Sequence, residues 1–407
     1  MSYPTRPRAR ALYRVALFAA LATLASACDA PRRDGVETPY LHSTKQLIPS
    51  ALLPDDVKPQ TSNNNLDVIE FEGRLYLVFR TGPSHFASPL VMLHLVSRPL
   101  GDETSRWRHE VSISMNTDLR EPRFFAFGSR LFLYFASLGA SRTAFEPGKM
   151  WRIERLGDAT YSEPTPVFVE GFIPWRIKWR RGRAYLLGYD GGENIYNFSG
   201  EPLHVYFLTT DNGTDWHAVV EGKAIVHTGG CSETDFEFLG DGSLIAVLRN
   251  EAGDQDGFGS KICRAPANAL ADWSCKPDKR KYDSPLLFAR GDAVYLIARR
   301  NISATGNYDL GRDELEYSQK LLQYQVDYWT RPKRCSLWRV DVESQHVDWI
   351  FDLPSRGDTC FPSILVHDEQ SYDVYNYSSA LDGKDISWQQ GQGRPTFIFR
   401  SRLSFLR

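Results

Sequence analysis

Charged and aromatic side chains stand at the beginning of short apolar segments along this chain of 407 residues. Carboxylates, arginines and tryptophan occur together there. This mixture suits a polyhydroxylated or anionic ligand, because carboxylates bind hydroxyl groups and carry out acid–base chemistry while arginine binds carboxylate or sulfate groups. The alternative is that these charges pair with one another and close the site. The positions concerned are Asp67, Arg120, Glu121, Trp175, Arg176, Glu233, Asp235, Asp283, Asp358 and Cys360.

The segments that carry these residues belong to a pattern that occurs six times. Each copy has a short apolar run, a turn with Gly or polar residues, and a second run rich in Tyr, Leu and Val. A spacing of about 50 residues suits one four-stranded sheet per copy. The sequence therefore predicts an all-β fold, a six-bladed β-propeller over residues 61–407, whose inner strands begin at the mouth of a central channel. The copies begin at Leu66, Leu119, Phe172, Asp235, Ser284 and Phe361.

One stretch departs from the strand pattern. Residues Asp313 to Tyr328 have the spacing of apolar residues that favours a helix. The stretch lies between the inner strands of the fifth copy and Cys335, so we expect an insertion at the rim of the channel. It could act as a lid, or it could be a surface decoration.

The N-terminus is typical of an export signal. Arginines between Arg6 and Arg14 precede an apolar run from Val15 to Ala27, which is too short to span a bilayer. The end of this run resembles a bacterial lipobox, in which Cys28 would be lipidated, although ordinary cleavage after Ala27 also fits. We expect a signal peptide over residues 1–28, a tether over 29–60, and an exported protein. It would be a membrane-anchored lipoprotein in the periplasm or on the cell surface, or otherwise secreted.

If the protein is exported, its five remaining cysteines can form disulfides, because disulfides persist in oxidising compartments. Cys263 and Cys275 flank a loop between two predicted strands, so we expect them to form a disulfide. The other three, Cys231, Cys335 and Cys360, allow one further pair and one free thiol. Cys360 could also face the channel.

Charge and ligand-type residues limit the classes of partner. The net charge is −2 and no basic stripe stands out, so nucleic acid is not an expected partner. No grouping of Cys and His has the spacing of a metal site, and no cofactor is predicted. The loops at residues 189–194 and 249–254 are rich in acidic and amide groups. They could coordinate calcium through oxygen atoms or could simply be solvated turns.

A second hairpin, from His204 to Val220, carries a recognisable turn. Its pattern Thr209-x-Asp211-x-Gly213-x-x-Trp216 resembles the Asp-box motif of BNR repeats. Asp can bind the backbone of a turn, Gly accepts a positive φ, and Trp packs the hairpin onto the blade. The motif is structural, so it indicates a fold and not a site.

The fourth copy adds a second resemblance. Glu233 precedes a strand pair with the pattern Leu-x-Asp-Gly-x-Leu, and the pair ends in Arg249. With the six copies and the Asp box, this resembles the sialidase (neuraminidase) superfamily over roughly residues 66–405. The resemblance implies that Glu233 would activate a nucleophilic tyrosine and that Arg249 would be one of three arginines that clamp a substrate carboxylate.

The chain departs from that superfamily at two places. The first copy has Leu66-Asp67-Val68 where an Arg-Ile-Pro tripeptide is usual, and Cys360-Phe361 stands where the nucleophilic tyrosine should open the sixth copy. Phenylalanine cannot attack an anomeric carbon, so the tyrosine mechanism does not carry over. Chemistry that uses two carboxylates is compatible with the residues present.

Two functions follow. The first is an exported glycoside hydrolase that acts on a glycan, with acidic and sulfated glycans among the candidates. The second is a non-catalytic glycan-binding lipoprotein on the same ring. For the hydrolase, Glu233 is the main acid–base candidate. Its carboxylate partner could be Asp235, Asp283 or Glu121. Of these three, Asp235 and Asp283 are assigned to catalysis together with Glu233. The expected substrate-binding residues are Arg120, Glu121, Trp175, Arg176, Arg249, Arg299 and Asp358.

Overall fold

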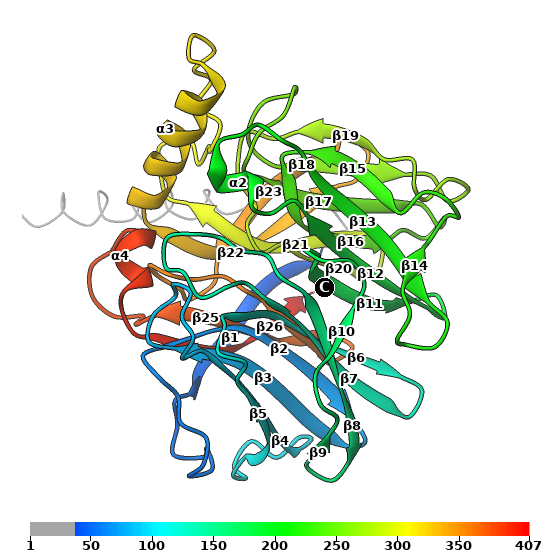
Figure 1. The fold of residues 1–407 in the computed structure, drawn as a ribbon, viewed down its shortest axis with the longest axis vertical. Helices are drawn as coiled ribbons and strands as arrows, with labels where there is room; N and C mark the ends of the chain where they lie inside the picture. Colours follow the sequence, from blue (N-terminus) through cyan, green and yellow to red (C-terminus); the bar gives the residue numbers. More distant parts are fainter. Residues whose placement is uncertain (1–36, 407) are drawn as a thin grey trace, which may run out of the picture.

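The computed structural model describes residues 37–406 and forms a six-bladed β-propeller (Figure 1). Each of the six sequence copies forms the two inner strands of one antiparallel sheet. The first three blades contain β2 (Ser62–Phe71), β3 (Arg74–Gly82), β4 (Met92–Pro99) and β5 (Arg108–Ile113); β6 (Leu119–Phe127), β7 (Arg130–Ser137), β8 (Met150–Gly157), β9 (Thr160–Tyr161) and β10 (Thr165–Val167); and β11 (Ile173–Arg180), β12 (Arg183–Asp190), β13 (Leu203–Thr210), β14 (His217–Ala218) and β15 (Ile225–Gly229).

The last three blades follow the same plan, with the first strand of each copy lying innermost. They contain β16 (Cys231–Phe238), β17 (Leu244–Asn250), β18 (Lys261–Ala265) and β19 (Ser274–Pro277); β20 (Leu286–Arg290), β21 (Ala293–Asn301), β22 (Lys333–Asp341) and β23 (His346–Asp352); and β24 (Ser363–Asp368), β25 (Ser371–Ser379), β26 (Thr396–Leu406) and β1 (Thr38–Ile48).

The ring is closed by pairing the two ends of the chain. β1 pairs antiparallel with β26, from Thr38 opposite Leu406 to Ile48 opposite Ile398. The prediction of a tether over residues 29–60 was therefore wrong for this strand, which is the outermost strand of the sixth blade. The physical reason is that the C-terminal copy supplies only three strands, and the fourth removes an open edge from β26. The predicted signal peptide and Cys28 lie outside the described residues.

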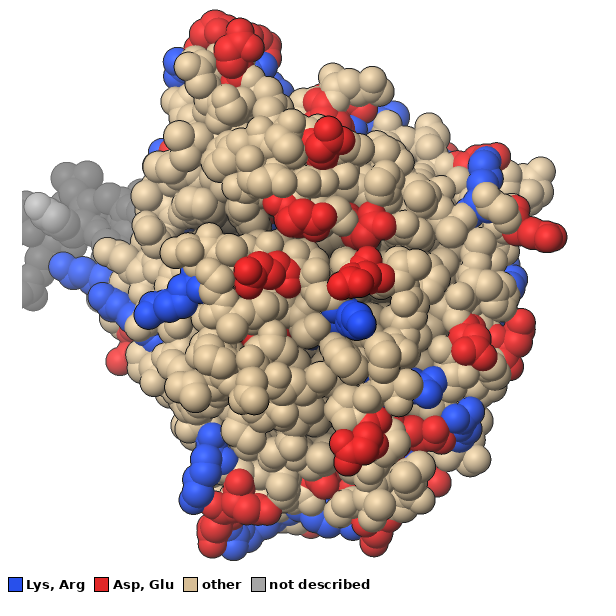
Figure 2. Space-filling view, in the orientation of Figure 1, with Lys and Arg blue, Asp and Glu red and all other residues tan. Residues whose placement is uncertain are grey.

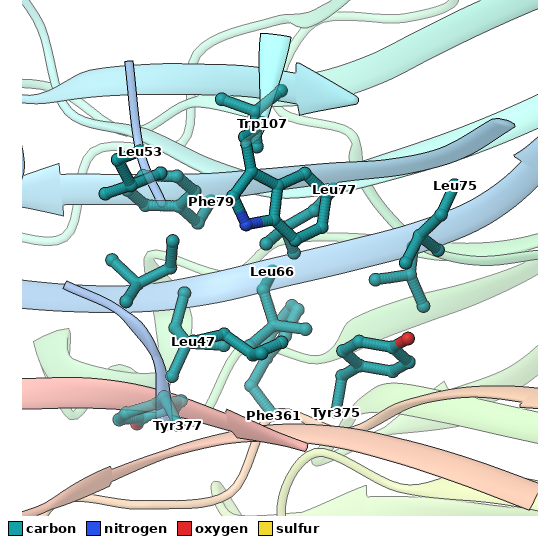
Figure 3. Packing of buried hydrophobic residues seen from close by; sticks show 14 of the residues in the cluster. Leu47, Leu53, Leu66, Leu75, Leu77, Phe79, Trp107, Phe361, Tyr375 and Tyr377 are labelled. Atoms are coloured by element: carbon teal, nitrogen blue, oxygen red, sulfur yellow. The ribbon is translucent and has the colours of Figure 1, made fainter. Parts of the chain in front are cut away.

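Apolar side chains fill the space between neighbouring blades. Figure 3 shows Leu66 and Leu77 of the first blade facing Phe361 and Tyr375 of the sixth blade, with Leu47 of β1 beside them. All five side chains are buried. The second strands of the blades, such as β7 and β17, are covered on both faces, and their sequences therefore contain continuous apolar runs rather than a strict alternation. This packing fixes the inner strands that carry the site.

The Asp-box-like turn folds the second hairpin of the third blade, but with different contacts from those expected. Asp211 is exposed, whereas the side-chain oxygen of Asn212 accepts hydrogen bonds from the N–H groups of Thr214 and Asp215, both at 2.9 Å. Trp216 is buried against the neighbouring blade. The turn therefore has its expected packing, with Asn212 in the role expected of the aspartate.

Two disulfides stiffen the fourth to sixth blades. Cys263 and Cys275 are opposite each other on β18 and β19 and are joined, which is the pairing that the sequence favoured. Cys335 of β22 is joined to Cys360, next to the first residues of β24. Cys360 thus links two blades and offers no thiol to the channel, while Cys231 is a buried free thiol.

Among residues 37–406, three helical segments lie outside the blades: α2 (Asn194–Asn197), α3 (Tyr317–Thr330) and α4 (Trp388–Gln392). The predicted helix is α3, which begins four residues later than expected. Its neighbour in space is α4, since Trp388 donates its N–H to the carbonyl of Arg331 at 3.0 Å. Within residues 37–406, no helix has the length and apolar character needed to cross a bilayer.

Candidate functional site

A cavity of about 480 Å³ lies where the inner strands begin. Its walls are formed by strand ends of several blades, the loops after β3 and β7, and all three helical segments. Figure 2 shows charged side chains in small separate groups across the face seen in Figure 1, without a continuous basic or acidic stripe. Of the predicted site residues, those that line the cavity are Arg120, Glu121, Trp175, Glu233, Arg249 and Arg299.

Four of the inner strands are interrupted by a β-bulge at the cavity. In β2, β6, β11 and β16 the inner strand has one residue more than its partner at this point. The bulged positions include Asn65, Glu121, Trp175 and Glu233, and all four line the cavity. A bulge re-aims side chains and bends the strand, which is why bulges occur next to functional sites. Equivalent positions of four blades are thus turned toward one space.

Glu121 is a buried carboxyl group at the cavity wall. It is 8% exposed and accepts a hydrogen bond from the Asn65 amide at 3.2 Å. Burial raises the pKa of Glu121 from 4.5 to about 7; the positive charge of Arg123 opposes this shift and the negative charge of Glu233 adds to it. A glutamic acid in such a setting keeps its proton up to neutral pH and can donate it.

Glu233 is the second carboxyl group at this wall, with different surroundings. One of its oxygens accepts a hydrogen bond from the Arg249 guanidinium at 2.9 Å, and the other accepts the N–H of Ser284 at 2.6 Å. Both oxygens therefore act as acceptors, as the oxygens of an ionised carboxylate do. The site thus contains one carboxyl group that favours the protonated form and a neighbour held by donors.

The three predicted arginines at the cavity are each paired with carboxylates of the protein. Arg120 lies 2.6 Å from Asp118, and Arg249 and Arg299 both bind Asp283, at 2.9 and 2.8 Å. Arg249 also contacts Glu233 and Glu251. Arg249 and Arg299, which the sequence assigned to substrate binding, are therefore paired with carboxylates of the protein in the structure.

Two arginine–aspartate pairs join successive blades. Arg80 and Arg249 each stand near the end of the second strand of a blade, and each binds an aspartate just before the inner strand of the next blade: Asp118 at 2.7 Å and Asp283 at 2.9 Å. The equivalent Arg299 reaches the next blade by donating to the carbonyl of Thr359, beside Asp358. These contacts between blades are a structural role.

Asp235 and Asp283, which the sequence assigned to catalysis, are not among the described residues that line the cavity. Asp235 is fully buried, lies 2.7 Å from Lys178, and accepts the N–H of Leu287 at 2.7 Å. Although burial opposes it, Lys281 and two arginines hold the pKa of Asp283 well below its usual range. Both carboxylates bind neighbouring blades together, so the structure does not bring them to the site.

Two predicted binding residues also lie behind the wall. Arg176 donates to the carbonyl of Pro285 at 2.9 Å and lies 3.4 Å from Asp235. Asp358 is fully buried and accepts hydrogen bonds from Tyr377 at 2.8 Å and His85 at 2.7 Å. Neither reaches the cavity surface, although His85 and Tyr377 do.

His85 is a cavity residue that the sequence analysis missed. Its Nδ1 is held by Asp358, and its Nε2 lies 3.2 Å from the Arg120 guanidinium, which can only donate. Burial lowers the pKa of His85, so the neutral ring is favoured. The imidazole therefore orients Arg120. The sequence offered one signal for His85: it follows Arg80 by five residues, in the loop after an inner strand pair.

The helical segments supply some of the aromatic residues of the wall. Gln325 and Trp329 of α3 and Trp388 of α4 line the cavity on one side, and Tyr196 of α2 lines it too. Tyr328 of α3 donates its hydroxyl hydrogen to Asp283 at 2.6 Å. The predicted rim insertion is therefore part of the cavity wall and is anchored to the ion-pair network beneath it.

The two loops considered for calcium have other partners. Asp190 accepts a hydrogen bond from Tyr206 at 2.7 Å, and Glu251 lies 3.0 Å from Lys281. Asp254 lies 2.9 Å from Lys261. These carboxylates are thus engaged with donors of the protein.

Comparison with known proteins gives a fold but not a family. No family model and no curated protein sequence matches the chain. Among solved structures, a protein of unknown function from Dyadobacter fermentans is 13% identical, over 90% of this chain and 99% of that one, with a TM-score of 0.58. Trypanosoma rangeli sialidase in complex with sialic acid is 11% identical, over 90% of this chain, with a TM-score of 0.55.

An α-L-arabinofuranosidase from Fusarium graminearum is a third similar structure. It is 11% identical over 84% of this chain and 93% of that one, with a TM-score of 0.52. The match to the Trypanosoma rangeli sialidase spans 58% of that longer chain. At these identities the likeness shows the fold, a sialidase-like six-bladed propeller.

Proposed function

We propose that this protein hydrolyses a glycosidic bond of a neutral glycan, with Glu121 as the general acid and Glu233 as the second carboxylate. The observation that carries the proposal is the pair itself. Two carboxyl groups at one cavity wall have opposite surroundings, and the pKa of Glu121 is raised to about 7. Environments that separate two carboxyl groups in this way assign acid and base roles.

The reaction follows from these roles. Glu121 transfers its proton to the glycosidic oxygen as the bond to the anomeric carbon breaks. Glu233 either attacks the anomeric carbon or removes a proton from the water that does so. In the first case the sugar is released with retained configuration, and in the second with inverted configuration. The structural neighbours, a sialidase and an arabinofuranosidase, are glycoside hydrolases, which supports this class of reaction.

The preference for a neutral sugar rests on the arginines. A substrate carboxylate or sulfate would have to compete with Asp118 for Arg120 and with Asp283 for Arg249 and Arg299. Each guanidinium would lose a partner that is already buried and correctly oriented. The aromatic residues Trp329 and Trp388 at the same cavity suit the apolar face of a sugar ring.

The test is turnover of a panel of chromogenic glycosides by the wild-type protein and matched variants. The panel contains neutral furanosides and pyranosides, a sialoside and uronides. We expect a neutral glycoside to be cleaved, and Glu233→Gln to lower kcat/KM by about 10²–10⁴-fold. Glu121→Gln should lower kcat/KM by a similar factor on glycosides whose leaving group requires a proton. Glu170→Gln, at an exposed glutamate, is the control and should leave kcat/KM unchanged.

Two outcomes would contradict the proposal. Preferred cleavage of the sialoside would refute the neutral substrate but retain the hydrolase. Absence of turnover on every glycoside, together with calorimetric binding of a glycan that Trp388→Ala abolishes, would establish the alternative of a non-catalytic glycan-binding protein.

We also propose that the chain is exported and anchored through a lipid on Cys28. The two disulfides support an oxidising compartment. Membrane fractionation of the producing cells tests this: the wild-type protein should sediment with membranes, and Cys28→Ala should not. A wild-type protein that is soluble throughout would refute the anchor.

A further inference from the structure

A second group of side chains with ligand atoms lies apart from the residues that line the cavity. His227 of β15, Cys231 at the start of β16 and Asp254 in the loop after β17 come together here. One ligand atom from each, an imidazole nitrogen, a sulfur and a carboxylate oxygen, lies within 4.8 Å of the others. The three residues come from two blades, so the fold and not the local sequence assembles the group.

The group contains a buried ring nitrogen without a hydrogen-bond partner in the described part of the chain, and Oδ2 of Asp254 beside it has only the Asn250 amide, at 3.5 Å. Nε2 of His227 is buried and has no hydrogen-bond partner among residues 37–406, and its distance to Oδ2 of Asp254 is 3.9 Å. Cys231 is fully buried and is a free thiol in the described part of the chain. A buried polar atom without a partner is costly, so an occupant that binds these atoms would remove that cost.

The backbone leaves room beside these atoms. A Cβ added to Gly229 would lie 2.9 Å from Oδ2 of Asp254 and 3.2 Å from Nε2 of His227. Any other residue at this position would therefore crowd both atoms. Glycine keeps the space next to the carboxylate and the imidazole free of a side chain.

Lysine 261 is the nearest competing cation, and it has a second partner. Its ammonium group lies 2.9 Å from Oδ1 of Asp254 and 2.7 Å from Asp256. Asp254 can thus use its other oxygen, Oδ2, while Lys261 stays paired. A hydrogen bond to the far oxygen of a ligating carboxylate is the usual arrangement around protein-bound metals.

We propose that His227, Cys231 and Asp254 bind one zinc-class divalent cation. Imidazole, thiolate and carboxylate together are the ligands of Zn²⁺, whereas Ca²⁺ takes oxygen ligands alone. Binding releases the thiol proton to solvent, so the thiolate and the carboxylate balance the two charges of the ion. Three protein ligands leave the fourth tetrahedral position for water. In the sequence, Asp254 was considered only as part of a possible calcium loop, and no zinc-type site was predicted, because these three residues follow no familiar spacing.

The test uses cobalt(II), which occupies zinc sites and reports its ligands by absorption. The full-length protein carries Cys28→Ser, so that Cys231 is its only cysteine outside the disulfides. We expect one cobalt ion per chain, a thiolate-to-cobalt charge-transfer band, and visible bands of tetrahedral intensity. Excess zinc should remove these bands, and zinc should raise the melting temperature.

Variants decide whether the three residues are the ligands. Cys231→Ser should abolish the charge-transfer band, and His227→Gln and Asp254→Asn should each weaken cobalt binding at least tenfold. His204→Gln is the matched control, because His204 also pairs with an aspartate but is not part of the three-residue group; it should change nothing. Circular dichroism checks that each variant is folded.

Either of two results would overturn the site. The first is saturating cobalt without a charge-transfer band in the folded parent protein. The second is an unchanged cobalt affinity and spectrum in folded Asp254→Asn and His227→Gln proteins. Neither readout depends on glycosidase activity, so the metal site stands or falls separately from the proposed function.

Discussion

Replacing Glu121 by glutamine should remove a pH-dependent part of the stability of the fold. The glutamine side chain has the shape of the protonated acid but cannot ionise. In the folded protein burial raises the pKa of Glu121 from 4.5 to about 7, whereas the unfolded chain keeps the ordinary value. The unfolded state therefore loses its proton first as the pH rises, and the folded state loses relative stability until Glu121 itself ionises.

The size and sign of the effect follow from the two pKa values. The stabilising contribution is complete below pH 4.5 and is lost by about pH 7. One unit of pKa corresponds to about 1.4 kcal/mol, so the interval corresponds to about 3 kcal/mol of unfolding free energy. Glu121→Gln should lack this loss. The unfolding free energy of the variant minus that of the wild type should therefore be about 3 kcal/mol larger above pH 7 than below pH 4.5.

Urea unfolding of both proteins from acid to mildly alkaline pH is the assay. The difference between the two free-energy curves isolates Glu121, because the other titrating groups are common to both proteins. Glu170→Gln, at an exposed glutamate, is the control and should follow the wild-type curve. Parallel curves for wild type and Glu121→Gln would refute the raised pKa and with it the assignment of Glu121 as a proton donor at neutral pH.

Three further predictions concern the framework around the site. Arg249→Leu removes the ion-pair partner of Glu233 and one of the cations that bind Asp283 and Glu251, so it should lower the unfolding free energy by about 3–5 kcal/mol in urea titrations. The more exposed pair of Arg334 should cost about 1 kcal/mol or less in Arg334→Leu, and equal losses would contradict the burial argument. Replacing Cys335 and Cys360 together by serine opens a 25-residue separation and should cost about 3–4 kcal/mol by the same titration, and an unchanged midpoint would show that the crosslink is dispensable. Deleting residues 37–48 removes β1 and exposes the edge of β26, so limited proteolysis should cut the sixth blade first, which an unchanged digestion pattern would disprove.

The blades could be predicted from sequence because each is a local unit. Two inner strands and a turn lie within about 20 residues, and their apolar runs recur six times. The closing strand could not be predicted in this way. Thr38 and Leu406 are opposite each other but stand at the two ends of the chain, and no local pattern joins them.

The site shows where residue counting along a strand fails. Glu233 and Asp235 were both assigned to catalysis because they stand at the start of the same inner strand. On a regular strand, side chains two residues apart would point to the same face. The bulge at Glu233 breaks this period, and it turns Glu233 to the cavity while Asp235 stays in the contact between blades. A bulge of the same kind turns Glu121 to the cavity. The sequence assigned Glu121 to substrate binding, whereas we propose it as the general acid.

The protonation state of Glu121 could not be predicted from the sequence either. It depends on burial, on Glu233 from a blade two positions away, and on Arg123, which lies against the rings of Trp175 and Phe361. These groups meet only after the ring has closed. Sequence patterns supply the residue types, but the tertiary structure sets their charge states.

The central claim, that Glu121 protonates the leaving group, is tested most directly by leaving-group dependence. Glycosides of the sugar that is cleaved best would be compared in wild type and Glu121→Gln, one with a dinitrophenyl leaving group and one with an alkyl leaving group. The dinitrophenolate leaves without a proton, so the variant should cleave that glycoside with close to the wild-type kcat/KM, and its kcat/KM on the alkyl glycoside should fall by about 10²–10⁴-fold. Equal losses on both substrates, or no loss on the alkyl glycoside, would contradict the account.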